Sequence, residues 1–119
     1  MKNRPFAERL GFALAGVREA WHREKSFRTQ GIVAVLVLLA LLVLRVPLIW
    51  FAIAVIAIAL VLAAEMINAA LEATIDRLHP ERHPEIRAAK DIAAGSVLLI
   101  SIAACIVGLL MLIAIYPIW

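Results

Sequence analysis

The sequence predicts an all-α integral membrane protein that has three transmembrane helices and, before them, an amphipathic helix on the membrane surface. Of its 119 residues, 65% are hydrophobic and 18% are charged, and apolar runs dominate from Ile32 onward. Runs of this kind are typical of membrane spans. The basic residues are clustered, with seven of the twelve Lys and Arg before Gly31 and four more in 77–90. Because basic residues beside spans mark the cytoplasmic side, both polar segments are expected there.

The charge distribution also favours some partners over others. The anionic surface of the cytoplasmic leaflet is the expected partner of clustered basic residues. Nucleic acid is not expected, because the chain has no basic and aromatic surface apart from the membrane flanks. At 119 residues the chain is long enough for one small bundle, so a single domain over 1–119 is predicted. A site that needs several walls would then be shared between copies of the chain.

The first element is predicted to be an amphipathic helix over 5–23. Arg and Trp beside a first span suit a helix that lies in the plane of the membrane interface. A cytosolic helix packed on the bundle is the alternative. The prediction depends on apolar residues that follow a helical spacing and therefore form one stripe: Phe6, Leu10, Leu14, Val17 and Trp21.

The first span is predicted over 29–45. Its apolar run, 31–44, has fourteen residues, or about 21 Å of helix. That is short for a hydrocarbon core of about 30 Å. Either the helix begins before Thr29, or Arg45 extends its side chain outward to the interface. The segment 45–47 ends in proline and is predicted to turn the chain on the far side of the membrane.

The second helix is predicted over 47–78, as a span with a cytosolic extension. The nineteen uncharged residues 46–64 give about 28 Å of helix, nearly the whole core. Glu65 therefore reaches the inner interface and not the centre of the bilayer. Two prolines, Pro80 and Pro84, then break the helix. The third span is predicted over 86–116, which places the N-terminus inside and the C-terminus outside.

A polar stripe follows the second apolar run. At 100° per residue, Glu65, Asn68, Glu72 and Asp76 lie within an arc of roughly 80°. Ionised carboxylates beside hydrocarbon are costly, so such a stripe is by default a functional-site hypothesis. The alternative is a polar seam that only joins helices. We favour the functional hypothesis, because a packing seam rarely needs three like charges so close together.

The polar groups at this interface suit metal-assisted chemistry. Carboxylate oxygens are ligands for Mg²⁺, which usually binds one or two of them together with substrate phosphates. Lys90 could neutralise phosphoryl charge, and a carboxylate free of metal could accept a proton from a hydroxyl. The Gly-rich nucleotide loops are missing from the sequence. From the residues alone, the prediction is a metal-assisted site at the membrane surface.

Three sequence motifs make this prediction more specific. The polar stripe reads Glu65-x-x-Asn68-x-Ala70-x-Glu72-x-x-x-Asp76, the third span opens with Ala89-Lys90-Asp91, and the first is preceded by Glu24-x-x-Phe27-Arg28. Together they resemble the prokaryotic diacylglycerol kinase family over nearly the whole chain. The resemblance implies a three-span protein of the bacterial cytoplasmic membrane that works as a homotrimer with active sites between chains. The implied activity moves the γ-phosphoryl of MgATP onto the hydroxyl of diacylglycerol.

The resemblance also implies roles for individual residues. By motif position, Glu65 is the catalytic base, and Glu24 and Glu72 hold Mg²⁺. The implied nucleotide contacts are Phe12, Glu24, Glu72, Asp76, Glu81, Arg82, His83, Lys90 and Asp91. The implied contacts to the lipid substrate are Trp21, Phe27, Arg28, Gln30, Glu65, Asn68 and Ala94.

The lipid acceptor and the protein class each have an alternative. Residues 93–95 look more like the undecaprenol kinase branch, whereas residues 18–21 look more like the diacylglycerol branch. Undecaprenol is therefore the second candidate acceptor. A small proton-coupled transporter is the alternative from another class, but it expects four spans and an acid deep in one of them. A non-enzymatic assembly subunit would leave the polar stripe and the pair Lys90 and Asp91 without a purpose.

Overall fold

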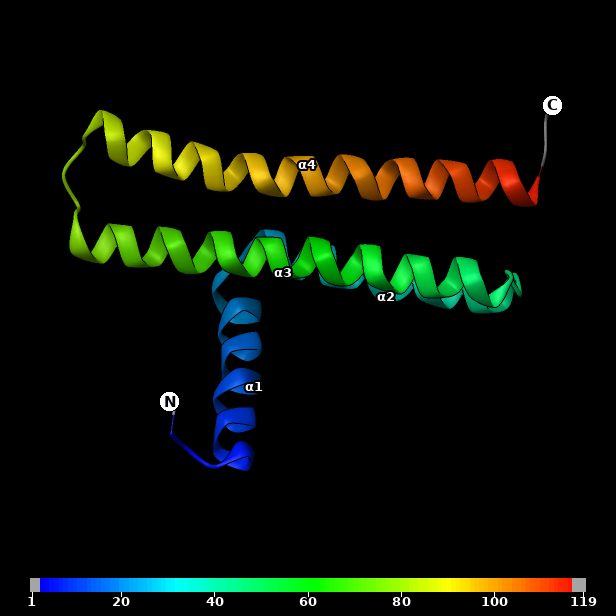
Figure 1. Cartoon of the computed structure of the whole chain (residues 1–119), viewed down its shortest axis with the longest axis horizontal. Helices are drawn as coiled ribbons and strands as arrows, with labels where there is room; N and C mark the ends of the chain where they lie inside the picture. The colour runs from blue at the N-terminus through cyan, green and yellow to red at the C-terminus, as the bar shows by residue number, and fades with distance from the viewer. Residues whose placement is uncertain (1–2, 117–119) are drawn as a thin grey trace.

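The computed structural model describes residues 3–116 and has four helices. They are α1 (Phe6–Arg23), α2 (Lys25–Val43), α3 (Leu48–Leu78) and α4 (Pro84–Ile115). Helices α3 and α4 lie side by side and antiparallel, α2 runs along α3, and α1 projects crosswise from the bundle (Figure 1). Helices α2, α3 and α4 are each long and apolar enough to cross a membrane. The prediction of an all-α integral membrane protein with three spanning helices is confirmed.

The α1–α2 junction is a single residue. Glu24 has an extended backbone (φ −111°, ψ 106°), and this residue separates the two helices. The helical ladder resumes at once, because the N–H of Arg28 donates to the carbonyl of Glu24 at 3.1 Å. Helix α2 therefore begins at Lys25 and not at residue 29, and its nineteen residues extend over about 28 Å. Of the two explanations for the short apolar run, the structure has the earlier start.

The turn between α2 and α3 is a helix C-cap in which an arginine takes the place usually given to glycine. Arg45 has a positive φ of 54°. Its N–H donates to Leu42 O, and the N–H of Val46 donates to Leu41 O. This pair of bonds is the Schellman motif, which satisfies the last carbonyls of a helix. Pro47 is the N-cap residue of α3, so the chain reverses within four residues, 44–47.

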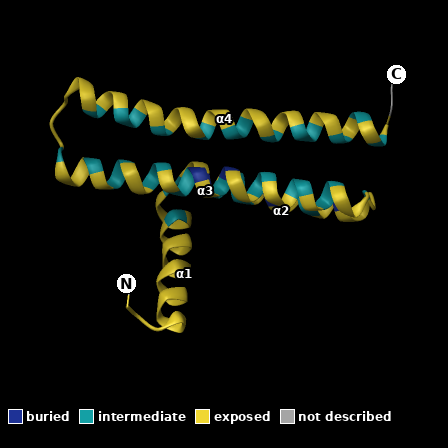
Figure 2. Cartoon of the chain, viewed as in Figure 1, coloured by how far each residue is buried: buried dark blue, intermediate teal, exposed yellow. Residues whose placement is uncertain are grey.

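Helix α3 is the centre of the bundle. It packs against all three other helices, whereas α2 and α4 do not pack directly against each other within residues 3–116. The interior is small, and Figure 2 shows α1 exposed along nearly its whole length. Lipid tails would solvate the many exposed apolar side chains, and polar groups gather at one end. The buried residues, all of them apolar, are Phe27, Ala34, Leu41, Val61 and Ala64.

The loop between α3 and α4 is held by helix caps at both ends. The N–H of His79 donates to Ile75 O at 2.7 Å and closes α3. Nδ1 of His83 accepts the N–H of Glu85 at 3.0 Å, and Pro84 occupies the first helical position of α4. A side-chain acceptor and a proline at these positions are typical of a helix start. Helix α4 accordingly begins two residues before the predicted third span.

Candidate functional site

The predicted site lies where α1, α2 and α3 meet and continues along α3 towards the loop. Helix α3 extends past the α1–α2 corner (Figure 1). Leu78, its last residue, is about 20 Å beyond Glu65 at 1.5 Å per residue. The polar residues of α3 follow this extension, with Glu72 about 10 Å and Asp76 about 16 Å from Glu65 along the helix axis. The structure therefore orders the predicted base, metal ligand and nucleotide contact along one helix.

Glu65 is half-buried and accepts a hydrogen bond from another helix. The hydroxyl of Ser26, in the first turn of α2, donates to its Oε1 at 3.1 Å. Within residues 3–116 the carboxylate has no cationic partner. A carboxylate without a bound cation remains available to accept a proton. This is the state that the predicted role of Glu65 as a base requires.

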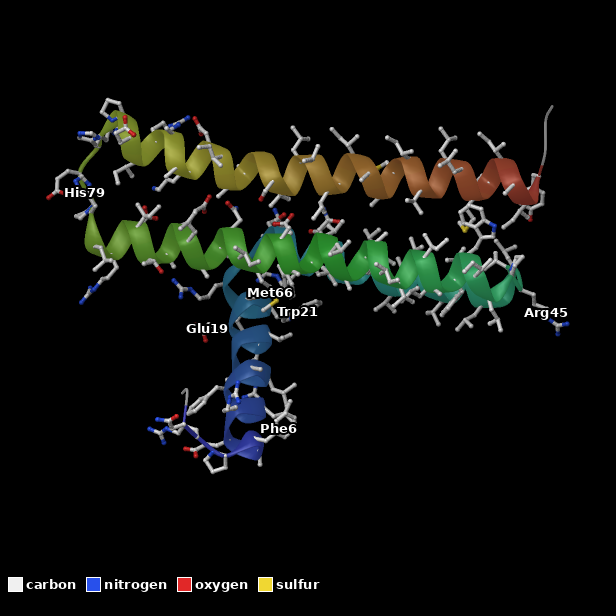
Figure 3. The ribbon with its side chains drawn as sticks, viewed as in Figure 1. Phe6, Glu19, Trp21, Arg45, Met66 and His79 are labelled. Carbon is white, nitrogen blue, oxygen red and sulfur yellow. The ribbon has the colours of Figure 1, made fainter. Side chains whose placement is uncertain are left out.

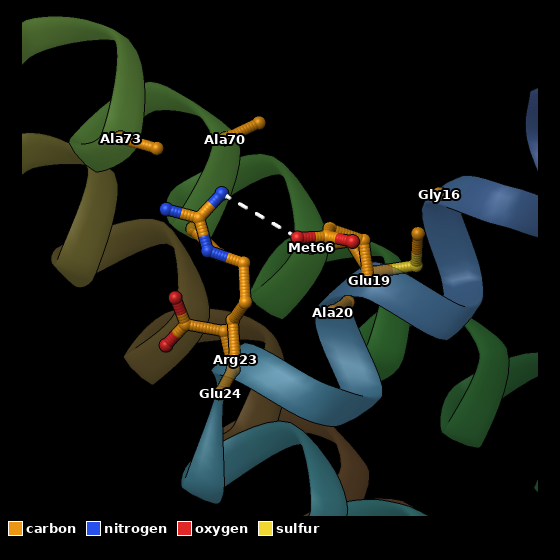
Figure 4. Close-up of a pocket in the computed structure, with 9 residues that line it drawn as sticks. Gly16, Glu19, Ala20, Arg23, Glu24, Met66, Ala70 and Ala73 are labelled. Atoms are coloured by element: carbon orange, nitrogen blue, oxygen red, sulfur yellow. Dashed lines mark ion pairs between the residues drawn. The ribbon is translucent and has the colours of Figure 1, made fainter. Parts of the chain in front are cut away.

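Glu24 faces α3 at the α1–α2 corner. Its side chain helps to line a pocket of about 270 Å³ between α1 and α3. Figure 4 shows Arg23 and Glu24 on one side of this pocket and Ala70 and Ala73 of α3 on the other, with Arg23 paired to Glu19 at 3.9 Å. Glu24 itself forms no ion pair within residues 3–116. Glu24 therefore faces the alanine-lined side of α3, and neither Glu65 nor Glu72 lines this pocket.

A second pocket lies at the loop end of the bundle. It has a volume of about 620 Å³ and is formed by the loop 79–83 together with the start of α4. Arg82, Arg87 and Lys90 all line it, with Glu81 as the only carboxylate in the lining. Pockets of this size are typical of small-molecule sites. The excess of positive charge suits an anionic ligand.

Lys90 connects this pocket to the polar stripe. Its Nζ lies 2.5 Å from Oδ1 of Asp76, which joins α4 to α3. In the next turn, Nε of Arg87 lies 3.2 Å from Oδ1 of Asp91. Arg87, Asp91 and Asp76 are exposed and the Lys90 side chain is 32% exposed, so the contribution of both pairs to stability is small. Their effect is on geometry, because the pairs hold two cations at the mouth of the loop pocket.

Asn68 presents an unsatisfied acceptor. Its Oδ1 is buried and has no hydrogen-bond partner within the described residues. A buried polar atom without a partner costs free energy, and in most proteins such an atom finds a donor. Asn68 lies one turn from both Glu65 and Glu72 on the same stripe. A donor from a ligand or from another copy of the chain would satisfy it.

The two predicted metal ligands, Glu24 and Glu72, are carboxylates, which is the chemical type of ligand that Mg²⁺ prefers. No cluster of three or more His, Cys, Asp or Glu side chains that could hold a metal occurs in residues 3–116. Glu24 and Glu72 are both half-buried and both free of ion pairs in this part of the chain. Mg²⁺ in kinases is usually held by one or two carboxylates and completed by phosphate oxygens and water.

Aromatic packing and one guanidinium fix the α1–α2 corner. Phe27 is 6% exposed and packs edge-on against Trp21, with ring centroids 6.5 Å apart. Arg28 donates to the carbonyls of Trp21 and His22, at 2.8 and 3.0 Å, and so caps the end of α1. Figure 3 shows Trp21 close to the crossing of α1 and α3. Since Phe27 is inside this corner, the structure gives it a packing role in the single chain.

Gly31 is the position at which this corner is most sensitive to size. A Cβ at Gly31 would lie 2.8 Å from Cζ3 of Trp21. We therefore expect Gly31→Ala to push the indole away and to cost about 1–3 kcal/mol of stability, as overpacking does. Denaturation of the solubilised protein by sodium dodecyl sulfate would measure this. Gly108→Ala is the matched control, because a Cβ there meets nothing within 4 Å. Equal stability of both variants would contradict the prediction.

Three predicted site residues, one each on α1, α2 and α4, form no hydrogen bond with the Glu65 stripe in residues 3–116. Phe12 is an exposed residue of α1, about three turns before the junction. Gln30 lines a small apolar pocket of about 110 Å³ that is formed by α2, α3 and Ala104 of α4. Ala94 is exposed on α4. Their predicted contacts remain predictions.

Ser26 was missed in the sequence. It occupies an unassigned position between Glu24 and Phe27, and nothing in the spacing of a single helix connects it to Glu65, 39 residues away. The sequence did offer one weak signal for this contact. Ser26 and the polar stripe that begins at Glu65 were both expected at the same membrane surface. Only the packing of α2 on α3 turns that coincidence into a contact.

Comparison with known proteins shows which family this sequence is similar to. The sequence model of the prokaryotic diacylglycerol kinase family matches residues 11–112. The diacylglycerol kinase of Escherichia coli K12 is 32% identical over 102 residues, which cover 86% of this chain and 84% of that protein. The undecaprenol kinase of Bacillus subtilis is 33% identical over 95 residues, covering 80% and 77%. The diacylglycerol kinase of Synechocystis is 38% identical over 98 residues, covering 82% and 56%.

Proposed function

Because this chain belongs to the prokaryotic diacylglycerol kinase family, we propose that it transfers the γ-phosphoryl of ATP to the hydroxyl of diacylglycerol, giving phosphatidic acid. The observation that carries the proposal is the state of Glu65. This carboxylate is half-buried, lies directly after an apolar run, and has no cationic partner within residues 3–116. A structural carboxylate in such a place would be expected to be paired.

In the proposed reaction Glu65 removes the proton of the lipid hydroxyl. The hydroxyl oxygen then attacks the γ-phosphorus, a new P–O bond forms, and the bond from phosphorus to the leaving ADP oxygen breaks. The position of Glu65 suits this role, because a diacylglycerol hydroxyl lies at the level of the headgroups and ATP is in the cytosol. Orientation and electrostatic stabilisation supply most of the remaining rate enhancement in phosphoryl transfer.

Glu24 and Glu72 would hold Mg²⁺, which, when bound, neutralises charge on the transferring phosphates. Both carboxylates are free of ion pairs in residues 3–116. Glu72 lies between Glu65 and Asp76 on α3. Glu72 would therefore hold the metal from the same helix face that carries the proposed base.

The loop pocket would bind the remainder of ATP. Arg82, Arg87 and Lys90 supply positive charge for its phosphates, and Asp76 fixes the position of the Lys90 ammonium. The predicted contacts of Glu81 and His83 belong to the same pocket. His83 would offer Nε2, because its Nδ1 is engaged as the cap of α4.

The assembly proposed for this enzyme is a homotrimer with sites shared between chains, and three observations support sharing. The single chain buries few residues, the acceptor of Asn68 lacks a donor within residues 3–116, and Phe12 is far from the stripe. The proposed orientation places α1 and the loop 79–83 in the cytosol and the α2–α3 turn outside. The exposed apolar residues of α1, such as Phe6 and Leu14, would contact the membrane surface.

Undecaprenol is the alternative acceptor, because a relative named undecaprenol kinase is as similar to this chain as the Escherichia coli diacylglycerol kinase. One assay separates the two: purified protein, γ-labelled ATP, Mg²⁺ and mixed micelles that contain both lipids. We expect the label in phosphatidic acid. Label in undecaprenyl phosphate would show that undecaprenol, and not diacylglycerol, is the acceptor. If folded protein transferred label to neither lipid, the kinase proposal would be overturned.

A further inference from the structure

The hydrogen bond between Ser26 and Glu65 is unusual among the polar contacts of this chain. It is the only side-chain hydrogen bond between α2 and α3 in residues 3–116. A serine in the first turn of a helix commonly bonds to nearby backbone. Here its hydroxyl instead contacts a carboxylate 39 residues away, at 3.1 Å. The other hydroxyls with hydrogen bonds, those of Thr74 and Ser96, donate within their own helices.

The backbone on both sides of this bond is packed. Phe27, the neighbour of Ser26, is 6% exposed, and Ala64, the neighbour of Glu65, is 9% exposed. Arg28 adds two hydrogen bonds to the carbonyls at the end of α1. The hydroxyl is therefore held on a rigid corner, and its direction is set by the crossing of α2 and α3. A rigid donor is able to fix the rotamer of a flexible glutamate.

We infer that Ser26 is a positioning residue for Glu65, an inference that rests on the proposed kinase function. Its hydroxyl occupies Oε1 and so leaves Oε2 as the oxygen that accepts the proton of the lipid hydroxyl. Without this bond Glu65 would sample several rotamers, and the reacting geometry would be populated less often.

The test compares Ser26→Ala, Ser26→Thr and the matched control Ser96→Ala, whose hydroxyl donates only to Ala93 O of its own helix. We expect Ser26→Ala to lower kcat about tenfold, with the KM values for ATP and lipid within twofold of wild type. Ser26→Thr keeps the hydroxyl and is expected to restore most of kcat. The control is expected to match wild type. A kcat for Ser26→Ala within twofold of wild type, or folded Ser26→Thr as slow as Ser26→Ala, would overturn the inference.

A double-mutant cycle on stability separates this inference from the proposed function. Ser26→Ala is combined with Glu65→Ala, and the resistance of all four proteins to sodium dodecyl sulfate is measured. We expect Ser26→Ala to destabilise wild type but to have little effect when Glu65 is absent, since paired groups are not additive. Additive effects would overturn the contact itself. If the wild-type protein had no kinase activity, the proposed function and the positioning role of Ser26 in catalysis would both be overturned. The double-mutant cycle would still show whether Ser26 and Glu65 interact.

Discussion

Glu65→Gln is expected to abolish phosphoryl transfer while leaving the helices and the oligomer intact. Glutamine has nearly the same shape and still accepts the hydrogen bond from Ser26, but it is a very weak proton acceptor. General base catalysis contributes about 10²–10⁴-fold to rate, so the residual kcat should be lower than wild type by a factor in that range. Transfer of label from γ-labelled ATP to lipid would measure it, together with circular dichroism and size-exclusion chromatography.

The control for this substitution is Glu8→Gln. Glu8 is an exposed residue near the free end of α1 and pairs with Arg4 at 2.7 Å. Exposed i, i+4 pairs contribute little to stability, so this variant should keep wild-type activity. A fully active Glu65→Gln protein would remove Glu65 as the base. Loss of activity in both variants would point to general damage by any change of charge.

Glu72→Gln is expected to raise the Mg²⁺ concentration required for half-maximal activity by at least about tenfold. Loss of residues that merely support a metal ligand costs about 10–100-fold in affinity, and Glu72 is proposed as a ligand itself. Part of the lost rate should return at high Mg²⁺, because a missing ligand weakens binding without removing the base. The measurement is a Mg²⁺ titration at fixed ATP and lipid.

Glu85→Gln is the matched control for the metal prediction. Glu85 is an exposed carboxylate in the first turn of α4, and its contact with His83 is made by its backbone N–H, which the substitution keeps. Its Mg²⁺ dependence should equal that of wild type. A wild-type titration curve for Glu72→Gln would argue against the metal role and would leave Glu24 to be tested alone.

The sequence determined those features that depend on distances within one helix. Composition and run length determined three spanning helices, and 3.6-residue periodicity determined that Glu65, Asn68, Glu72 and Asp76 share one stripe. These predictions need only the rise and turn of an α-helix. The same reasoning located the helix break at the prolines of the loop 79–83 and the first position of α4, because proline cannot continue a helical ladder.

Local rules were less successful at the ends of helices. The predicted first span began at residue 29, whereas α2 begins at Lys25. Residues 25–30 are mostly polar, and polarity was taken as a boundary of the span. A helix does not end where its side chains become polar, however; here a single extended residue, Glu24, separates α1 from α2. Backbone angles at one residue are not visible in composition.

Only the tertiary structure decided which groups meet across helices. The contact of Ser26 with Glu65, the pair of Lys90 with Asp76, and the close approach of Gly31 to Trp21 each join different helices. Each contact depends on the rotation and axial offset of one helix against another. Those quantities are set by many weak packing contacts and by the geometry of the turns, so they have no signature in the spacing of a single segment.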